Sequence, residues 1–216
     1  MGQYYLIANF TKKQYFRPLE GSKLLEFSFQ GTRTVNAITN LLSGELDGDL
    51  NWIGDDVLVI GDYTDENYPE NVSASEATES FEKHLSDYQI RLGTNYTSLY
   101  DYVSKNFQMI NLPESLMEEP EKRYLINRKR REYVDLNYLP LQYYEYPDGL
   151  DIEYIAPLPL LLAVGNGQGG GDYQDNFRDY EKVGLWTTTS EFVAVSDDRR
   201  SIRGLKNLEP YFYIGY

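Results

Sequence analysis

The sequence contains no cysteine, one histidine, His84, and no long hydrophobic run. The absence of cysteine excludes disulfides, cysteine nucleophiles and thiolate zinc sites, and it fits a reducing compartment. No apolar stretch approaches the roughly 20 residues that span a bilayer, and the opening MGQYYLIANF lacks the basic and apolar segments of a signal peptide. We therefore expect a cytoplasmic protein without membrane contact, stabilised by packing alone.

Basic residues are also scarce relative to acidic ones. The chain holds 20 lysines and arginines against 34 aspartates and glutamates, a net charge of −14. A surface of this sign repels nucleic acid and anionic membranes, so we expect a basic protein partner and no direct nucleic-acid contact. The charge is uneven: residues 65–120 hold 3 basic and 11 acidic residues, whereas residues 121–216 hold 12 and 15.

The sequence nearly repeats itself. Tyr5-Leu6-Ile7 and Lys12-Lys13-Gln14-Tyr15 return, after one gap, as Tyr124-Leu125-Ile126 and Arg130-Arg131-Glu132-Tyr133. In both copies an apolar stretch, a Gly/Asp-rich loop, a tryptophan and a β-branched run ending in aspartate follow. This order predicts an α+β fold of two β-rich pseudo-repeats made by internal duplication, residues 1–64 and 121–216, around an inserted α-helical hairpin, 65–120. We expect one compact domain, with Trp52 and Trp186 in equivalent core positions and an aromatic C-terminal tail.

The elements of the two units follow from their patterns. Alternation and β-branched content predict strands in the first unit at 5–10, 14–17, 23–29 and 57–60, with a short helix at 35–42. The second unit offers strands at 123–127, 132–136 and 192–195, and 152–155 as a match to the third strand. Its segment 158–162 occupies the helix position, but Pro157 and Pro159 predict a different geometry there.

The insert changes to helical spacing. Ser73 and Glu76 read as a capping box. One face then carries Ala77, Phe81, Leu85, Tyr88 and Leu92, and Gly93 is expected to end this helix. A second apolar stripe between residues 96 and 107 predicts a partner helix.

Three segments resemble a group of uncharacterised bacterial, plasmid and phage proteins that open in the same way. They are Met1-Gly2-Gln3-Tyr4-Tyr5, the stretch from Trp52 to Tyr63 and the loop from Gly165 to Asp172. The resemblance spans most of the chain and implies a mobile-element or bacterial cytosolic setting. It implies no activity, because no function is established for that group.

The glycine-rich loop at 165–171 is the first candidate for chemistry. Closely spaced glycines let backbone N–H groups form an anion-binding nest, but Walker and Rossmann spacings are absent, so a plain flexible loop is the simpler interpretation. Arg128 to Arg131 crowd the second hairpin turn, where a solubilising tip is again the simpler interpretation. If this region binds a ligand, the candidate residues are Gly167, Gly169, Gly170, Gly171, Asp172, Arg130 and Arg131.

Carboxylates offer a second candidate, a calcium or magnesium site. No EF-hand order of ligands is present, so solvated turns are the expected role, with no metal bound. The aspartates concerned are Asp47, Asp49, Asp55, Asp56, Asp62, Asp172, Asp175, Asp179, Asp197 and Asp198. His84 lies in the first predicted inserted helix and reads as a helix-face residue, so a Ser-His-Asp arrangement is not indicated. With no carboxylate pair selected at glycosidase spacing either, we expect neither an enzyme nor a cofactor.

Tyrosine is abundant, at 21 residues, and interleaves with acidic residues along the insert. Exposed tyrosines are enriched in interfaces, although a tyrosine-rich core with a solvated acidic face explains the pattern as well. Our leading hypothesis is a non-catalytic binding or inhibitor protein that binds a basic partner. Phage counter-defence proteins such as anti-CRISPR inhibitors bind the nucleic-acid channel of a host enzyme in this way. Its expected contact residues are Glu76, Glu79, Glu82, Asp87, Tyr88, Asp101 and Tyr102. The alternative is a small-ligand or nucleotide-binding protein that uses the cleft between the repeats and the Gly165–Gly171 loop; a purely structural or immunity protein is the third possibility.

Overall fold

The structure is a computed structural model that describes residues 3–63, 72–92, 96–139, 141–146, 149–167, 180–209 and 212, with the side chains of 72–77, 141–146 and 149–153 excepted. The fold is α+β. The first half contains, in order, β1 (Tyr5–Asn9), β2 (Gln14–Phe16), α1 (Leu24–Phe27), α2 (Arg33–Leu41), η1 (Gly48–Leu50), β3 (Val57–Gly61), α3 (Val72–Asp87), α4 (Leu99–Asn106), β4 (Gln108–Met109) and η2 (Glu114–Leu116).

The second half continues the same alternation of short strands and helices. It contains β5 (Tyr124–Asn127), β6 (Glu132–Asp135), η3 (Leu136–Tyr138), β7 (Leu141–Tyr146), β8 (Gly149–Tyr154), α5 (Pro157–Leu161), β9 (Ala163–Val164), η4 (Tyr180–Lys182), η5 (Thr187–Phe192), β10 (Val193–Ser196), η6 (Arg199–Ile202) and β11 (Lys206–Asn207). Across the described residues, no helix has the length and apolar character needed to cross a membrane.

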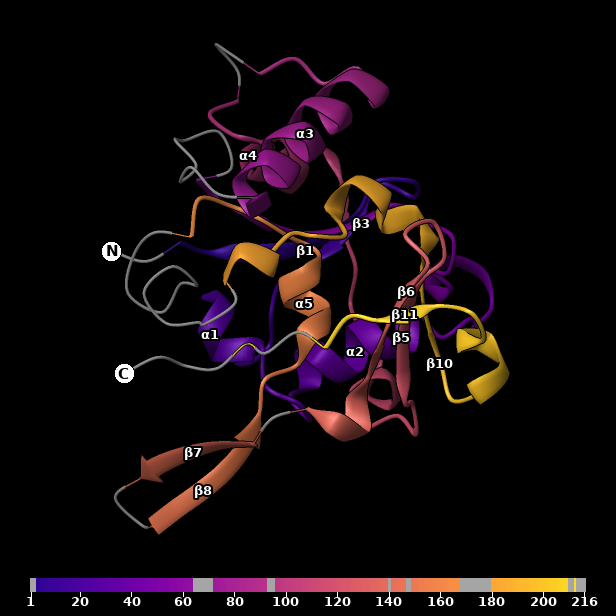
Figure 1. The fold of residues 1–216 in the computed structure, drawn as a ribbon. Helices are drawn as coiled ribbons and strands as arrows, with labels where there is room; N and C mark the ends of the chain where they lie inside the picture. Colours follow the sequence, from indigo (N-terminus) through magenta and orange to yellow (C-terminus); the bar gives the residue numbers. More distant parts are fainter. Residues whose placement is uncertain are drawn as a thin grey trace.

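The first sheet lies between two helical layers. Its strand order is β4-β2-β1-β3-β9, and every residue of β1 and β3 is buried. Alternate residues face opposite sides, as the two-residue period of a strand requires. Ile7 and Val59 join one hydrophobic cluster with α2 and α5, whereas Leu6 and Leu58 join another with the α3–α4 insert. Figure 1 shows α3 and α4 on one side of β1 and β3, and α2 and α5 on the other.

The second sheet has the order β10-β5-β6-β11, and it shares its inner face with the first unit. Leu125, Val134 and Val195 belong to the same hydrophobic cluster as Ile7 and Val59, so one core serves both units. The third sheet is the β7–β8 hairpin, which extends away from the body of the molecule (Figure 1).

The two units have the same pairing pattern. In β1, Asn9 pairs with Gln14 of β2 and with Val57 of β3. In β5, Asn127 pairs with Glu132 of β6 and with Val193 of β10 in the same register. Each hairpin also has a parallel edge strand, β4 beside β2 and β11 beside β6.

Two backbone hydrogen bonds outside the strand pairs occupy matching positions in the two units, and each joins one unit to the other. The Val59 N–H donates to the Leu162 carbonyl at 2.9 Å, and the Val195 N–H donates to the Leu42 carbonyl at 3.0 Å. An antiparallel bridge between Phe29 and Ile155 joins the units again. These matched bonds support the predicted duplication, which as a statement about ancestry stays a prediction.

Both tryptophans are fully buried and hold equivalent positions. The Trp52 backbone N–H donates to the carbonyl of Leu41 at 2.8 Å, and the Trp186 N–H donates to that of Leu161 at 2.9 Å, so each ties its loop to the last residue of a helix. Proline is compatible with α5 because Pro157 stands at its first position, where an N–H has no helical partner. The expectation that 158–162 differs from a helix was therefore wrong.

Two further expectations were wrong. Within the predicted strand 23–29, Leu24–Phe27 form the helix α1, because the Glu26 carboxylate accepts a hydrogen bond from the Lys23 N–H at 3.0 Å and caps the turn. Strand β8 therefore has no strand counterpart in the first unit. Helix α3 ends at Asp87, before Gly93, because Gln89 adopts a φ of 54° and the Ile90 N–H donates back to the Leu85 carbonyl at 2.8 Å.

Candidate functional site

A buried carboxylate, Asp56, joins three separate elements at the start of β3. His84 of α3 approaches it through Nε2 at 3.0 Å, and the hydroxyl of Tyr88 donates to its Oδ2 at 2.9 Å. The Ser190 hydroxyl in η5 donates to Oδ1, and Lys83 Nζ lies 3.9 Å from Oδ2. The network fixes α3 to the first sheet and to the second unit.

The network carries charge inside the protein. Burial alone raises the pKa of Asp56, but hydrogen bonds from His84 and Ser190 and the positive charges nearby outweigh it and lower the pKa to about 2. The other ring nitrogen of His84, Nδ1, lies 2.6 Å from the Ser80 carbonyl oxygen. Both ring nitrogens of His84 therefore lie within hydrogen-bond distance of oxygen atoms. Burial and the Asp56 carboxylate together raise the pKa of Tyr88 above its ordinary value.

This group of residues is not a catalytic triad. In a triad the imidazole lies between the carboxylate and the nucleophilic hydroxyl. Here Asp56 lies between His84 and Ser190, so the Ser190 hydroxyl contacts the carboxylate and not the imidazole, and all three residues are buried. The geometry therefore positions α3.

Sequence reasoning missed this network. It placed Asp56 among the solvated carboxylates, which is wrong, and it treated His84 as an ordinary helix-face residue. Two signals were available: Asp56 directly precedes a continuously apolar strand, and His84 lies one helical turn from Tyr88. Ser190 carries no comparable signal, because it lies 134 residues from Asp56.

The outer face of α3 carries three of the predicted partner residues. Glu79, Glu82 and Asp87 are exposed, and none forms an ion pair with a described residue. Glu76 lies one turn earlier in the same helix, and its side chain is outside the described part.

The other three predicted partner residues are engaged within the fold. The Tyr88 hydroxyl binds Asp56, and the Asp101 carboxylate accepts from Lys105 Nζ at 2.8 Å. The ring of Tyr102 packs edge-on against Tyr96, with 5.0 Å between ring centroids. The acidic surface is therefore narrower than predicted and centres on α3.

The predicted ligand residues do not come together in the described part of the chain. Gly167 is buried with a φ of 70°, whereas Gly169, Gly170, Gly171 and Asp172 lie outside the described residues. Arg130 Nε donates to Glu132 at 3.1 Å, and Arg131 Nη2 donates to the Gly204 carbonyl at 3.1 Å. Neither arginine is among the residues that line the cavity described next.

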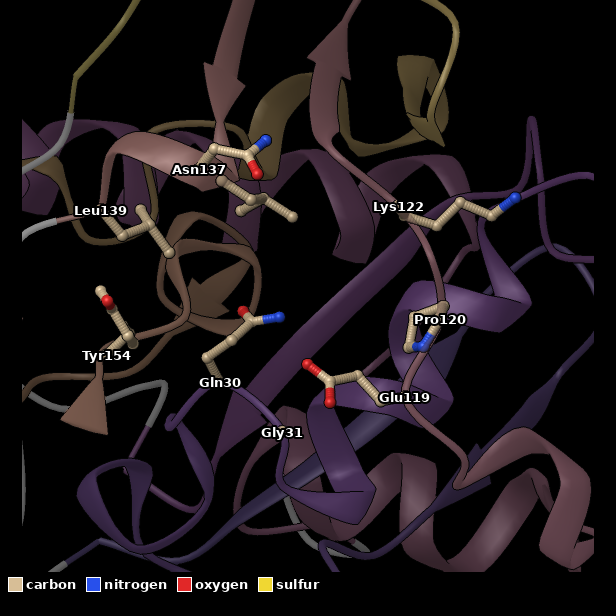
Figure 2. A pocket seen from close by; sticks show the side chains of 9 residues that line it. Gln30, Gly31, Glu119, Pro120, Lys122, Asn137, Leu139 and Tyr154 are labelled. Atoms are coloured by element: carbon tan, nitrogen blue, oxygen red, sulfur yellow. The ribbon is translucent and has the colours of Figure 1, made fainter. Parts of the chain in front are cut away.

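A cavity of about 470 Å³ does lie between the units, but other residues line it. Its walls are Gln30, Gly31, Glu119, Pro120, Lys122, Leu136, Asn137, Leu139 and Tyr154. Figure 2 shows the Glu119 carboxylate and the Gln30 amide near one another, whereas the Lys122 ammonium group points away toward its ion pair with Glu45. The charged group left facing the space is therefore a carboxylate.

The described aspartates do not assemble into a metal site. Within the part of the chain that the structure describes, no group of three histidine or carboxylate residues is placed to hold a metal ion. Asp55 instead accepts from Asn9 Nδ2 at 2.8 Å, and Asp198 accepts from Arg200 Nε at 2.9 Å. Asp47, Asp49 and Asp197 are exposed, while Asp172, Asp175 and Asp179 lie outside the described residues.

Comparison with known proteins found no family model, no curated protein and no solved structure that matches this chain. Function is therefore inferred from the residues and contacts of this chain.

Proposed function

We propose that the chain is a non-catalytic protein-binding protein that presents the outer face of α3 to a basic partner. The observation that carries this proposal is the exposed set of Glu79, Glu82 and Asp87, none of which forms an ion pair with a described residue, because Lys83 of the same helix is paired with Asp56 and Glu191. Unpaired surface carboxylates steer a basic partner and favour its encounter. The partner class we propose is the nucleic-acid channel of a host defence enzyme, met in a bacterial or phage-infected cytosol.

The way in which α3 is held favours a binding role. The inner face of the helix is fixed by His84 and Tyr88 on Asp56, and Phe81 and Leu85 pack on the second hydrophobic cluster. A helix held on one side by charged and apolar contacts presents its outer carboxylates in a fixed arrangement. Less conformational entropy is then lost when a partner binds.

Reversing the charge of this face should abolish capture of the partner. We expect the triple variant Glu79→Lys/Glu82→Lys/Asp87→Lys to retain less than about a tenth of the protein partner that the original chain captures from bacterial lysate at 50 mM NaCl. Capture by the original chain should also fall at 500 mM NaCl, because salt screens charges at a surface. Quantitative mass spectrometry of the captured proteins measures both effects.

The matched control is Asp49→Lys/Glu118→Lys/Glu121→Lys, which makes the same change in net charge at exposed positions outside α3. This control should capture the partner normally. Equal losses in the two variants, or capture that does not respond to salt, would contradict the proposal.

The cavity between the units favours a second candidate function, the binding of a small polar ligand. Its lining combines two amides, Gln30 and Asn137, with the Glu119 carboxylate. A carboxylate repels phosphate, so this cavity suits a small amine better than a nucleotide.

Thermal-shift measurements with putrescine and with ATP distinguish these ligand classes. Putrescine at tenfold its Kd should raise the Tm by about 3–6 °C, since such binding adds about 1.4 kcal/mol to the stability of a chain this size. The Glu119→Gln variant should lose that shift while its Tm without ligand stays the same. A shift with ATP alone, or one that Glu119→Gln retains, would contradict the assignment.

A further inference from the structure

A basic face lies on the second unit. We define it by exposed cations from the β5–β6 turn, from η6 with the residue that follows it, and from β11: Arg128, Lys129, Arg131, Arg199, Arg200, Arg203 and Lys206. Figure 1 shows β11, and the yellow coil of η6 beside β10, away from α3. The basic face is therefore distinct from the acidic surface on which the proposed function rests.

The fold brings these distant segments together through two hydrogen bonds. The Lys206 N–H donates to the Arg131 carbonyl at 2.9 Å, in the parallel pairing of β11 with β6. Nη2 of Arg131 donates to the Gly204 carbonyl at 3.1 Å. The turn after β5 and the segment after η6, more than 70 residues apart, therefore form one continuous surface.

Several cations on this face are free to meet a ligand. Arg128, Arg199 and Arg203 form no ion pair with a described residue, whereas Arg200 is held by Asp198 at 2.9 Å. A shallow hollow of about 380 Å³ is lined by Arg199, Arg200, Ile202 and Arg203. Three arginine side chains thus line one shallow hollow.

The charge of this region opposes that of the chain. Residues 121–135 and 196–208 hold 10 basic and 5 acidic residues, and 7 of the 11 arginines, in a protein of net charge −14. We expected no nucleic-acid contact because of that net charge, which sums an acidic and a basic region of the protein. With a Debye length of about 8 Å at physiological salt, a local patch governs contact more than the distant total.

We propose that the basic face binds the phosphodiester backbone of double-stranded nucleic acid without reading base sequence. Arginine matches phosphate oxygens with paired N–H donors, which explains the preference for arginine on this face. Single strands are bound by stacking bases on exposed aromatic rings. The seven residues of this face include no aromatic ring, and Phe192 beside it has Lys129 Nζ at 5.8 Å from its ring centroid, so the face itself offers phosphate contacts.

Fluorescence anisotropy with a fluorescein-labelled 20-base-pair DNA duplex tests this proposal. We expect binding at 50 mM NaCl that weakens about 40-fold by 200 mM, since three phosphate contacts give a log–log salt slope of about −2.7. The triple variant Arg199→Gln/Arg200→Gln/Arg203→Gln should bind at least about tenfold more weakly at 50 mM NaCl and show a clearly shallower salt slope. A duplex of scrambled sequence should bind equally.

The matched control, Arg17→Gln/Arg91→Gln/Lys105→Gln, removes the same charge from exposed positions outside the basic face and should bind as the original chain does. Circular dichroism checks that each variant is folded. The absence of binding at 50 mM NaCl, equal weakening in both variants, or tighter binding of the same-length single strand would overturn the proposal. Tighter binding of polyglutamate than of duplex at equal charge concentration would instead identify an acidic protein as the partner and would also overturn it.

Discussion

Replacing Asp56 by alanine will lower the free energy of unfolding by about 3–5 kcal/mol, because it removes the ionised centre of a buried hydrogen-bonded network. The substitution leaves the buried His84 ring without its carboxylate partner and deprives Tyr88 and Ser190 of their acceptor. Lys83 keeps Glu191 at 3.5 Å, so the loss falls mainly on the buried groups. Urea unfolding at pH 7, followed by circular dichroism, measures the change.

Asp49→Ala is the control, since Asp49 is exposed and should change stability by less than about 0.5 kcal/mol. A double-mutant cycle of Asp56→Asn with His84→Gln should show a coupling energy of at least about 1 kcal/mol, because the two side chains are in direct contact. A loss below about 1 kcal/mol for Asp56→Ala would mean that the network does not hold α3 in place.

Acid titration of the same variants gives an independent readout. The pKa of Asp56 is about 2 in the folded protein against an ordinary 3.8, so folding favours its ionised form. A depressed pKa contributes stability that is complete above pH 3.8 and is lost as the pH falls through 2, here about 2 kcal/mol. Unfolding free energies of the original chain should therefore fall more steeply between pH 4 and pH 2 than those of Asp56→Asn.

Local sequence pattern predicted much of the fold because many of its elements have a clear period. The buried runs of β1 and β3 and the helix α2 lie within a residue or two of their expected bounds. Segment 23–29 failed because its helix depends on a single cap, Glu26 on Lys23, and its last residues on the distant bridge between Phe29 and Ile155. The two-residue edge strands β4 and β11 are too short to produce an alternating pattern at all.

The candidate surfaces were harder to predict because they depend on contacts between distant residues. The pairing of Asp56 with His84 spans 28 residues, and Tyr88 reaches the same carboxylate. The helical period placed Tyr88 on the apolar face with Phe81 and Leu85, but no local pattern indicates that its hydroxyl meets a carboxylate there. The basic face was not predicted for a related reason. A net charge sums acidic and basic residues over the whole chain, so it cannot indicate that folding brings Arg131 to the segment after η6.

Replacing either tryptophan by alanine will lower the free energy of unfolding by about 3–5 kcal/mol, and the effect should be similar for both. Trp52 and Trp186 are fully buried in the same hydrophobic cluster. Their indole N–H groups also have equivalent acceptors at the start of the second strand of each hairpin, Gln14 at 3.2 Å and Glu132 at 3.0 Å. Each truncation therefore removes a large ring and leaves a polar acceptor without one of its donors.

Phenylalanine variants test whether the two units unfold together. Trp52→Phe and Trp186→Phe should each lose less than the alanine variants, about 1–3 kcal/mol, because the ring volume is mostly kept and the indole hydrogen bond is lost. Each leaves one tryptophan, whose fluorescence reports on one unit alone. Since Leu125 and Val195 share a core with Ile7 and Val59, both fluorescence transitions should coincide with circular dichroism in urea. Separate midpoints for the two tryptophans would show that the units are independent and that the crossed bonds at Leu42 and Leu162 do not couple them.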